Sequence, residues 1–166
     1  MPQVATFHIG NEIFGVNILL TKEIGKIQEI TQVPNAPEFV LGLMNLRGQI
    51  VTVMDPGVFL DQKTGVAVEE RRLIILKNQF ELDELYRNDL IGEINMSRDT
   101  LAIVIDRIGD VIDVEPESIR ATPPNLASVK KEFVAGIIQH GQKLIILLDM
   151  SALAKRCIPQ AETLHS

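Results

Sequence analysis

"FVLGLMNLRGQIVTVMDP", residues 39–56, is the stretch that decides how this chain folds. Two apolar runs flank the tetrapeptide NLRG at residues 45–48, whose asparagine and glycine favour a tight turn. The stretch therefore predicts a β-hairpin. Residues 133–150 repeat the pattern without a gap, at a constant offset of 94 residues from Phe39 to Phe133. The repeat predicts two similar β-units in one chain.

Both copies of the repeat end their second apolar run with an aspartate, Asp55 in the first and Asp149 in the second. Because the aspartate recurs at the same place, we interpret both residues as caps of the turn that follows. A weaker similarity links residues 14–16 (FGV) with residues 101–103 (LAI), at a different offset. Chance explains this second similarity equally well.

The two hairpin turns differ in one residue type that matters chemically. The first turn reads NLRG, whereas the second, at residues 139–142, reads QHGQ, so only the first carries an arginine, Arg47. A planar guanidinium with five donors suits a carboxylate or a set of backbone carbonyls on a partner. Pairing within the fold, or simple solvation of the turn, explains Arg47 equally well.

Short strand-forming runs separated by turn residues fill most of the chain and predict an all-β barrel or sandwich. The expected strands are residues 4–9, 13–18, 22–31, 50–54, 72–77, 101–105, 108–114, 133–138 and 144–148. The acidic segment 78–95 fits either a short helix or a long loop. Residues 151–157 predict a short terminal helix with Ser151 as its N-cap.

Each β-unit of about 70 residues is marginal for independent stability, so the two should share a buried seam. A seam between two units also creates a groove, and grooves of this kind bind ligands and peptides.

Composition argues against several classes of partner. The 166 residues carry a net charge of −6, no Trp and one Tyr, which disfavours binding to nucleic acid or to an anionic membrane. No window reaches 18 apolar residues, and the N-terminus lacks a signal-peptide pattern, so we expect a cytoplasmic protein without direct membrane insertion. The single cysteine, Cys157, cannot form an internal disulfide.

We find no motif for catalysis, for a metal or for a cofactor. The histidines His8, His140 and His165 are far apart in sequence and have no neighbouring ligands at metal-site spacing. Cys157 has no evident base. We therefore expect no enzyme, no catalytic residue, no metal and no cofactor, and interpret the chain as a binding module.

Four segments, "TKEIGKI", "FVLGLMNLRGQIVTVMD", "LAIVIDRIGDVIDV" and "FVAGIIQHGQKLIILLDM", resemble the CheW family of chemotaxis coupling proteins. The resemblance implies two five-stranded, SH3-like β-barrels related by a pseudo-two-fold, with short helical turns and a short C-terminal helix. It implies one CheW-like domain over residues 1–157, with subdomains at roughly 15–70 and 71–157. Strand 4–9 would pack at their junction, and residues 158–166 would form a flexible tail.

The resemblance also implies a function. Such proteins are non-enzymatic adaptors that couple the cytoplasmic tips of methyl-accepting chemoreceptors to the regulatory domain of the histidine kinase CheA, in membrane-bound receptor arrays. Residues matching the partner-binding surface of the family are Thr21, Lys22, Glu23, Ile24, Gly42, Asn45, Leu46, Arg47 and Gly48.

The chain departs from the family pattern at three places. Thr52 stands where proline is common, residues 55–57 (DPG) replace the usual Asp-Leu-Arg run, and segment 78–95 is long and acidic. These departures keep an alternative open, in which the chain is an adaptor of a parallel chemosensory pathway or a competitor of the main adaptor.

Overall fold

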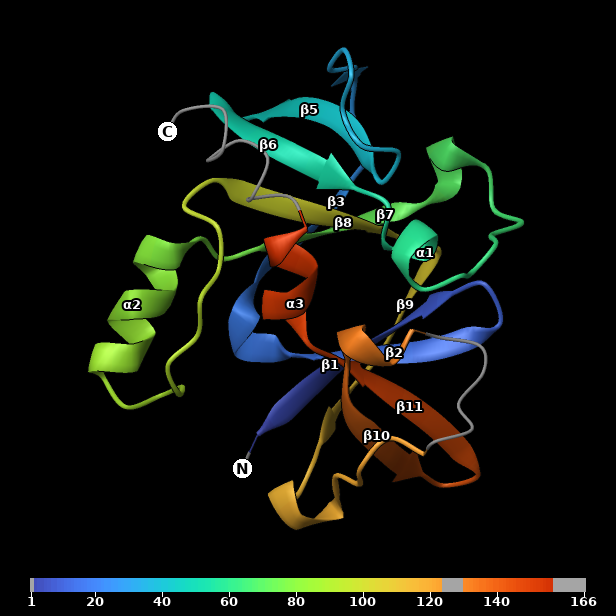
Figure 1. Ribbon diagram of the computed structural model, residues 1–166, viewed down its shortest axis with the longest axis vertical. Coiled ribbons are helices and arrows are strands. Elements are labelled where there is room, and N and C mark those ends of the chain that lie inside the picture. Colours follow the sequence, from blue (N-terminus) through green and yellow to red (C-terminus); the bar gives the residue numbers. More distant parts are fainter. Residues whose placement is uncertain (1, 124–129, 157–166) are drawn as a thin grey trace.

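Figure 1 shows a computed structural model of the chain, which describes residues 2–123 and 130–156. Their strands are β1 (Gln3–Ile9), β2 (Glu12–Asn17), β3 (Thr21–Lys26), β4 (Ile30–Thr31), β5 (Val40–Leu46), β6 (Gln49–Met54), β7 (Arg72–Leu76), β8 (Thr100–Ile105), β9 (Arg107–Asp113), β10 (Val134–His140) and β11 (Lys143–Leu148). Their helices are α1 (Pro56–Phe59), α2 (Gln79–Arg87) and α3 (Met150–Lys155), with 3-10 turns η1 (Ile18–Leu20), η2 (Val68–Glu70), η3 (Pro116–Ser118) and η4 (Lys131–Phe133).

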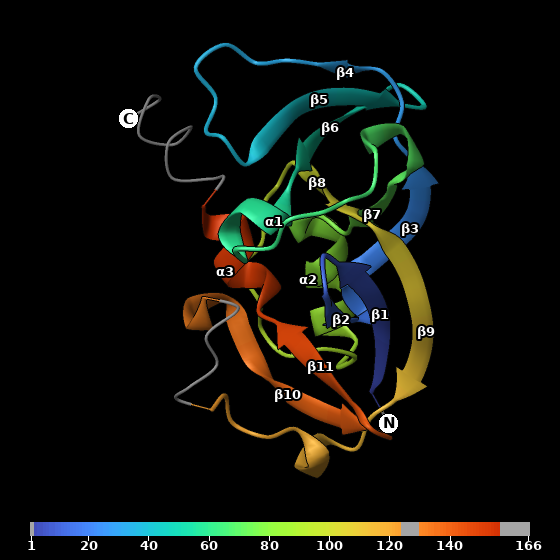
Figure 2. The ribbon, with the colours of Figure 1, turned by 90° about the vertical axis from the view of Figure 1, so that its right-hand side faces the viewer.

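The strands form two sheets, as the mostly-β prediction requires. Sheet I has the order β3-β7-β8-β6-β5-β4, and sheet II has the order β10-β11-β2-β1-β9. Sheet I lies at one end of the molecule and sheet II at the other (Figure 2). The predicted fold of two barrel-like β-units with short helices is confirmed. The predicted tail, residues 158–166, lies outside the described residues.

The pseudo-two-fold extends beyond the repeated hairpins. Strand β6 pairs in parallel with β8, and β11 pairs in parallel with β2. Thr52 opposes Leu101 in the first pair, and Ile146, its equivalent in the repeat, opposes Phe14 in the second. The weak similarity between residues 14–16 and 101–103 therefore marks structurally equivalent strands and is not chance.

The sheets do not follow the subdomain boundary predicted near residues 70 and 71. Strands β7 and β8 pair with β3 and β6 in sheet I, whereas β1 and β2 pair with β9 and β11 in sheet II. Strand 4–9, as β1, pairs with β2 and β9 within sheet II, and its Phe7 also packs in the core that both sheets share. The sequence repeat identifies local hairpins, but the choice of sheet depends on long-range pairing that a local pattern does not encode.

The core explains why β7 and β8 are almost continuously apolar. Alternate residues of a strand point to opposite faces of its sheet. On β8, Ile103 faces the largest cluster of buried side chains, while its neighbour Ala102 faces a separate cluster within sheet I. The largest cluster also contains Phe7 and Phe14 of sheet II, so the two sheets share one core. This shared core is the seam that the short length of each unit predicts.

Aspartate caps begin the helices that follow both repeated hairpins. The Asp55 carboxylate accepts a hydrogen bond from the Gly57 N–H at 3.0 Å, and the Asp149 carboxylate accepts one from the Ala152 N–H at 3.1 Å. The predicted cap at Ser151 is wrong, because this hydroxyl donates to Asp149 at 2.6 Å from inside α3. The capping interpretation of both aspartates is confirmed.

The acidic segment contains a true helix, α2, which begins with a capping box. The Asn78 side chain accepts from the Glu81 N–H at 3.0 Å, and the Glu81 carboxylate accepts from the Asn78 N–H at 3.1 Å. Leu82 anchors the helix in the shared core. The sequence left a helix and a loop open for this segment. The capping box and the buried Leu82 explain why it forms the helix.

Removal of the α3 cap should lower stability measurably. We expect Asp149→Ala to reduce the free energy of unfolding by about 1 kcal/mol, because the Ala152 N–H loses its acceptor. Ser151→Ala should cost clearly less, since the carboxylate keeps its bond to the helix. Urea denaturation followed by circular dichroism measures both variants. Equal losses would contradict the assignment of Asp149 as the cap.

Candidate partner-binding groove

A groove separates the outer strands of the two sheets. Strand β3 ends sheet I and β9 ends sheet II, and the two strands follow the same side of the molecule (Figure 2). The cavity between them has a volume of about 70 Å³. Its walls are Ala5, Thr6, Ile18, Thr21, Ile24, Ile74, Ile108, Gly109 and Val111.

The rim of the groove presents large apolar side chains to solvent. Ile24 on β3 is 52% exposed, and Val111 and Ile108 on β9 are 51% and 38% exposed. Single exposed apolar residues are ordinary, but apolar residues gathered around a cavity are typical of a binding surface. The groove therefore offers an apolar partner about three side chains that gain from burial.

Equivalent strand irregularities shape the two walls. The register of β3 against β7 shifts between Thr21 and Glu23, and the register of β1 against β9 shifts between Ala5 and Phe7. Gly109 lies in the second irregularity, where a Cβ atom would approach the Thr6 hydroxyl to 2.4 Å. A bulge bends its strand away from the regular ladder, so the same irregularity opens the groove from both sides.

The turn between β5 and β6 presents Arg47 beside β3. The Asn45 side chain accepts a hydrogen bond from the Gly48 N–H at 2.9 Å and closes the turn. Arg47 has a φ of +51°, in the left-handed region where the second copy places Gly141. An arginine is strained in this conformation, whereas a glycine is not. Turn geometry alone therefore does not explain why an arginine occupies position 47.

Arg47 forms an ion pair with Glu23, the residue before Ile24 on β3. Pairing within the fold, one of the interpretations left open by the sequence, is therefore present. The Arg47 side chain nevertheless stays 68% exposed, and the bond to Glu23 uses one terminal nitrogen, Nη2. An exposed pair of this kind adds little stability, and the guanidinium keeps donors for a partner.

The other predicted site residues divide between the groove and the framework. Thr21 lines the groove, and its hydroxyl donates to the Ile18 carbonyl at 2.7 Å. The Lys22 ammonium lies 3.1 Å from the Glu81 carboxylate of α2 and so points toward that helix. Gly42 is a framework residue that lies against the backbone of Thr31.

Leu46 and Gly48 complete the framework group. Leu46 is half-buried and packs against the apolar cluster within sheet I. Gly48 has a φ of +85° at the tip of the turn, with open space where a Cβ would lie. Of the nine predicted residues, the structure brings Thr21 and Ile24 together in the groove. Glu23, the partner of Arg47, opposes Ile75 and lies on the other face of β3, so the ion pair does not line the groove.

The β9 wall of the groove escaped the residue-level prediction, although the sequence carries a signal for it. Ile24 opposes Ile74 on β7, and Val111 opposes Ala5 on β1, so Ile24 and Val111 are equivalent under the pseudo-two-fold. They are 87 residues apart, the same offset that relates Phe14 to Leu101. Extending the weaker repeat to the next strand would have found Val111.

A second, polar pocket of about 90 Å³ is formed by the strands of sheet II. His8, His140, Lys143 and Asp110 are among the residues that line it. Burial of the ring, reinforced by the charges of Arg107 and Lys143, lowers the pKa of His8 below its ordinary value. His8 is therefore held toward its neutral form.

Three structural features are absent from residues 2–123 and 130–156. These residues contain no cluster of three or more His, Cys, Asp or Glu side chains able to hold a metal ion. None of their buried side-chain nitrogen or oxygen atoms lacks a hydrogen-bond partner. No helix among them is long and apolar enough to cross a membrane.

Comparison with known proteins agrees with this architecture. Residues 3–157 match the family described as the CheW-like domain. The chain belongs to the CheW-like domain family. It is 30% identical over 147 residues to the chemotaxis protein CheW of Klebsiella aerogenes, covering 89% of this chain and 78% of that protein. It is 28% identical to the chemotaxis protein CheW of Treponema pallidum, covering 91% and 81% of the two chains.

A solved CheW-like structure has the same fold. The crystal structure of the scaffolding protein TtCheW from Thermoanaerobacter tengcongensis superposes with a TM-score of 0.73 at 27% sequence identity. The match covers 92% of this chain and 88% of that one. The fold and the family implied by the four sequence segments are thereby confirmed.

Proposed function

We propose that this chain is a chemotaxis scaffold that couples the cytoplasmic tips of chemoreceptors to the histidine kinase CheA. The observation that carries the proposal is the open apolar groove between β3 and β9, together with the exposed Arg47, which pairs with Glu23 of β3. Relatives named as chemotaxis proteins, and a similar structure named as a scaffolding protein, support the same function. The chain acts by binding and changes no covalent bond.

The groove suits an apolar stripe of a receptor helix. A receptor tip is a hairpin of helices, and an amphipathic helix places apolar side chains at i, i+3, i+4 and i+7 along one face. Ile24 from one wall and Val111 from the other would cover such a stripe. Arg47 would then donate to a carboxylate, or to the carbonyls at a helix C-terminus, and so set the orientation of the helix.

The kinase would bind surfaces other than the groove. Its regulatory domain has the same fold as the adaptor by family resemblance, and the two sheets of this chain lie at opposite ends of the molecule (Figure 2). A partner of the same fold that met each end would alternate with the adaptor in a chain or ring. Interfaces of about 1,200 Å² or less would be weak alone and gain strength through multivalency.

Co-sedimentation tests the proposal directly. The purified protein is mixed with receptor-containing membranes and CheA, and both the sedimented fraction and kinase activity are measured. We expect the chain to sediment with the membranes and to raise the amount of kinase that sediments with them. If the chain binds neither receptor nor kinase, the adaptor proposal fails.

Reversal of the charge at Arg47 should weaken receptor binding. Arg47→Glu places a carboxylate beside Glu23 and replaces a donor by an acceptor, so we expect about a three- to tenfold loss of affinity for receptor membranes. Arg156→Glu is a matched control, since it reverses the charge of another exposed pair, between Arg156 at the end of α3 and Glu132 in η4. Circular dichroism checks the fold of both. Equal binding by parent and Arg47→Glu would remove Arg47 from the interface.

A further inference from the structure

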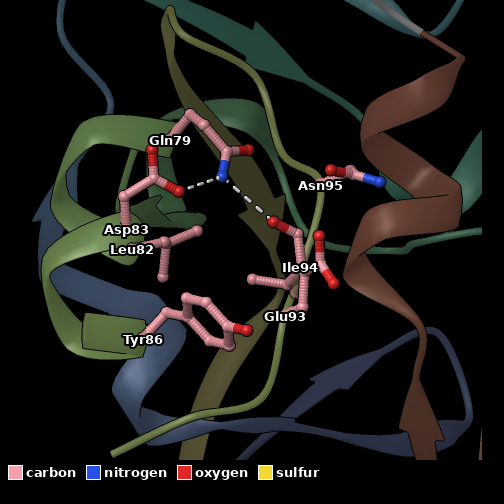
Figure 3. A pocket seen from close by; sticks show the side chains of 7 residues that line it. All are labelled: Gln79, Leu82, Asp83, Tyr86, Glu93, Ile94 and Asn95. Carbon is pink, nitrogen blue, oxygen red and sulfur yellow. Dashed lines mark hydrogen bonds between the residues drawn. The ribbon is translucent and has the colours of Figure 1, made fainter. Parts of the chain in front are cut away.

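A pocket lies between α2 and the chain that returns from it, apart from the groove. Its volume is about 120 Å³. The helix contributes Gln79, Leu82, Asp83 and Tyr86, and the returning segment contributes Glu93, Ile94 and Asn95 (Figure 3). Neither the groove residues nor Arg47 take part, so this pocket is independent of the proposed receptor site.

Gln79 ties the two walls of the pocket together. Its side-chain N–H group donates to the Asp83 carboxylate at 2.8 Å and to the Ile94 carbonyl at 3.0 Å, as Figure 3 shows. Its side-chain oxygen accepts from the Met96 N–H, and its backbone N–H donates to the Ser97 carbonyl at 2.8 Å. Because four bonds from one residue span both walls, the pocket is preformed and its occupant meets little ordering cost.

The walls combine an aromatic ring with carboxylates. Tyr86 lies one turn after Asp83 on the same face of α2, and Glu93 lies on the opposite wall. Gln79 binds Oδ1 of Asp83, and Oδ2 has no hydrogen-bond partner within the described part of the chain. A cation gains from an aromatic face and from a nearby carboxylate, whereas an anion would be repelled.

The surrounding surface has the same sign. Between residues 79 and 95 the chain carries five acidic side chains, Glu81, Asp83, Glu84, Asp89 and Glu93, against one basic side chain, Arg87. One of the five, Glu81, is already engaged by Lys22. The remaining negative charge would draw a basic segment toward the pocket.

We propose that this pocket receives a lysine or arginine side chain from a basic segment of a partner protein. The aliphatic stem of that side chain would lie along Leu82 and Ile94, and its charged head would lie between the Tyr86 ring and the Asp83 carboxylate. Long cationic side chains combine an apolar stem with a charged head in this way. The site would give the scaffold a contact distinct from both receptor groove and sheet ends.

Titration of the whole ¹⁵N-labelled protein with a capped pentapeptide, Ala-Leu-Arg-Leu-Ala, tests the proposal. We expect saturable shifts of backbone amides at residues 79–96, with affinity in the millimolar range. The same peptide with citrulline in place of arginine keeps the shape and loses the charge, and should bind at least about threefold more weakly. Equal binding of the two peptides, no saturable shift, or shifts mainly elsewhere would overturn the proposal.

Two substitutions and one control locate the binding energy. Asp83→Asn keeps an oxygen for Gln79 and removes the charge, and Tyr86→Leu keeps apolar bulk and removes the ring. Each should weaken arginine-peptide binding about threefold. Glu84→Gln removes the same charge from an exposed neighbour of Asp83 that does not line the pocket, and should change affinity less. A loss with Glu84→Gln as large as with Asp83→Asn would show only diffuse attraction and overturn the site.

Discussion

Gly42→Ala is expected to lower the free energy of unfolding by about 2–4 kcal/mol. Gly42 has a φ of +147°, which residues with a side chain rarely adopt. A Cβ atom built there would lie 2.3 Å from the Thr31 carbonyl oxygen and 2.7 Å from a methyl group of Ile30. The backbone of β4 would have to move away from β5, because a carbonyl cannot rotate aside as a side chain can.

Gly48→Ala measures the cost of backbone strain alone, without the close approach of neighbouring atoms that Gly42→Ala adds. Gly48 also has a positive φ, +85°, but no atom lies within 4 Å of its added Cβ. This variant should lose only about 1–2 kcal/mol. Urea denaturation, followed by circular dichroism, compares both with the parent. If Gly42→Ala were no less stable than Gly48→Ala, the close packing of β4 against Gly42 would not be the reason that a glycine is needed there.

The family motif predicts Gly42 at a partner surface, whereas its contacts with β4 place it in the framework of sheet I. The family motif includes Gly42 together with Arg47, but Gly42 allows β4 to pack against β5, whereas Arg47 is an exposed side chain. A sequence motif records that both residues matter and does not record why. Only the distance from Gly42 to the Thr31 backbone assigns the glycine to the framework.

Much of the fold could be predicted because it is local. Alternating apolar residues and turn residues locate the hairpins on either side of Gly10, Gly48 and Gly141, and each of these glycines has a positive φ. The constant offset between the two copies predicts the internal symmetry. The hairpins and the two aspartate caps depend on neighbours in sequence, which a single sequence displays.

Two parts of the fold and site could not be predicted, because they depend on distant residues. The assignment of β1 and β2 to sheet II follows from pairing with β9 and β11, roughly 100 to 130 residues further along the chain. The partner of Arg47 is Glu23, on a strand that does not adjoin the hairpin in the sheet. A helix start is local in principle, yet Ser151 and Asp149 compete as caps two residues apart, and the choice rests on the Ala152 N–H direction.

Val111→Asp should reduce binding to receptor membranes by at least about tenfold, and this prediction rests on the proposed function. The side chain of Val111 lies on the β9 wall and is 51% exposed, so the free protein can hydrate an aspartate there with little loss of stability. A helix in the groove would cover the carboxylate. Burial of an unpaired charge costs several kcal/mol, and each 1.4 kcal/mol is tenfold in affinity.

Val68→Asp provides the matched control, since it makes the same change of side chain and charge at a valine that is 45% exposed in η2 and does not line the groove. Co-sedimentation with receptor membranes, with urea denaturation as the check on folding, compares the two variants. Equal loss of binding in both would attribute the effect to net charge, because the protein already carries −6. A loss confined to Val111→Asp would require the partner to displace water from the β9 wall.

Ile24 lies across the groove from Val111, on β3, so Ile24→Asp should produce the same loss of binding. If the Ile24→Asp variant bound normally, the partner would cover only the β9 wall.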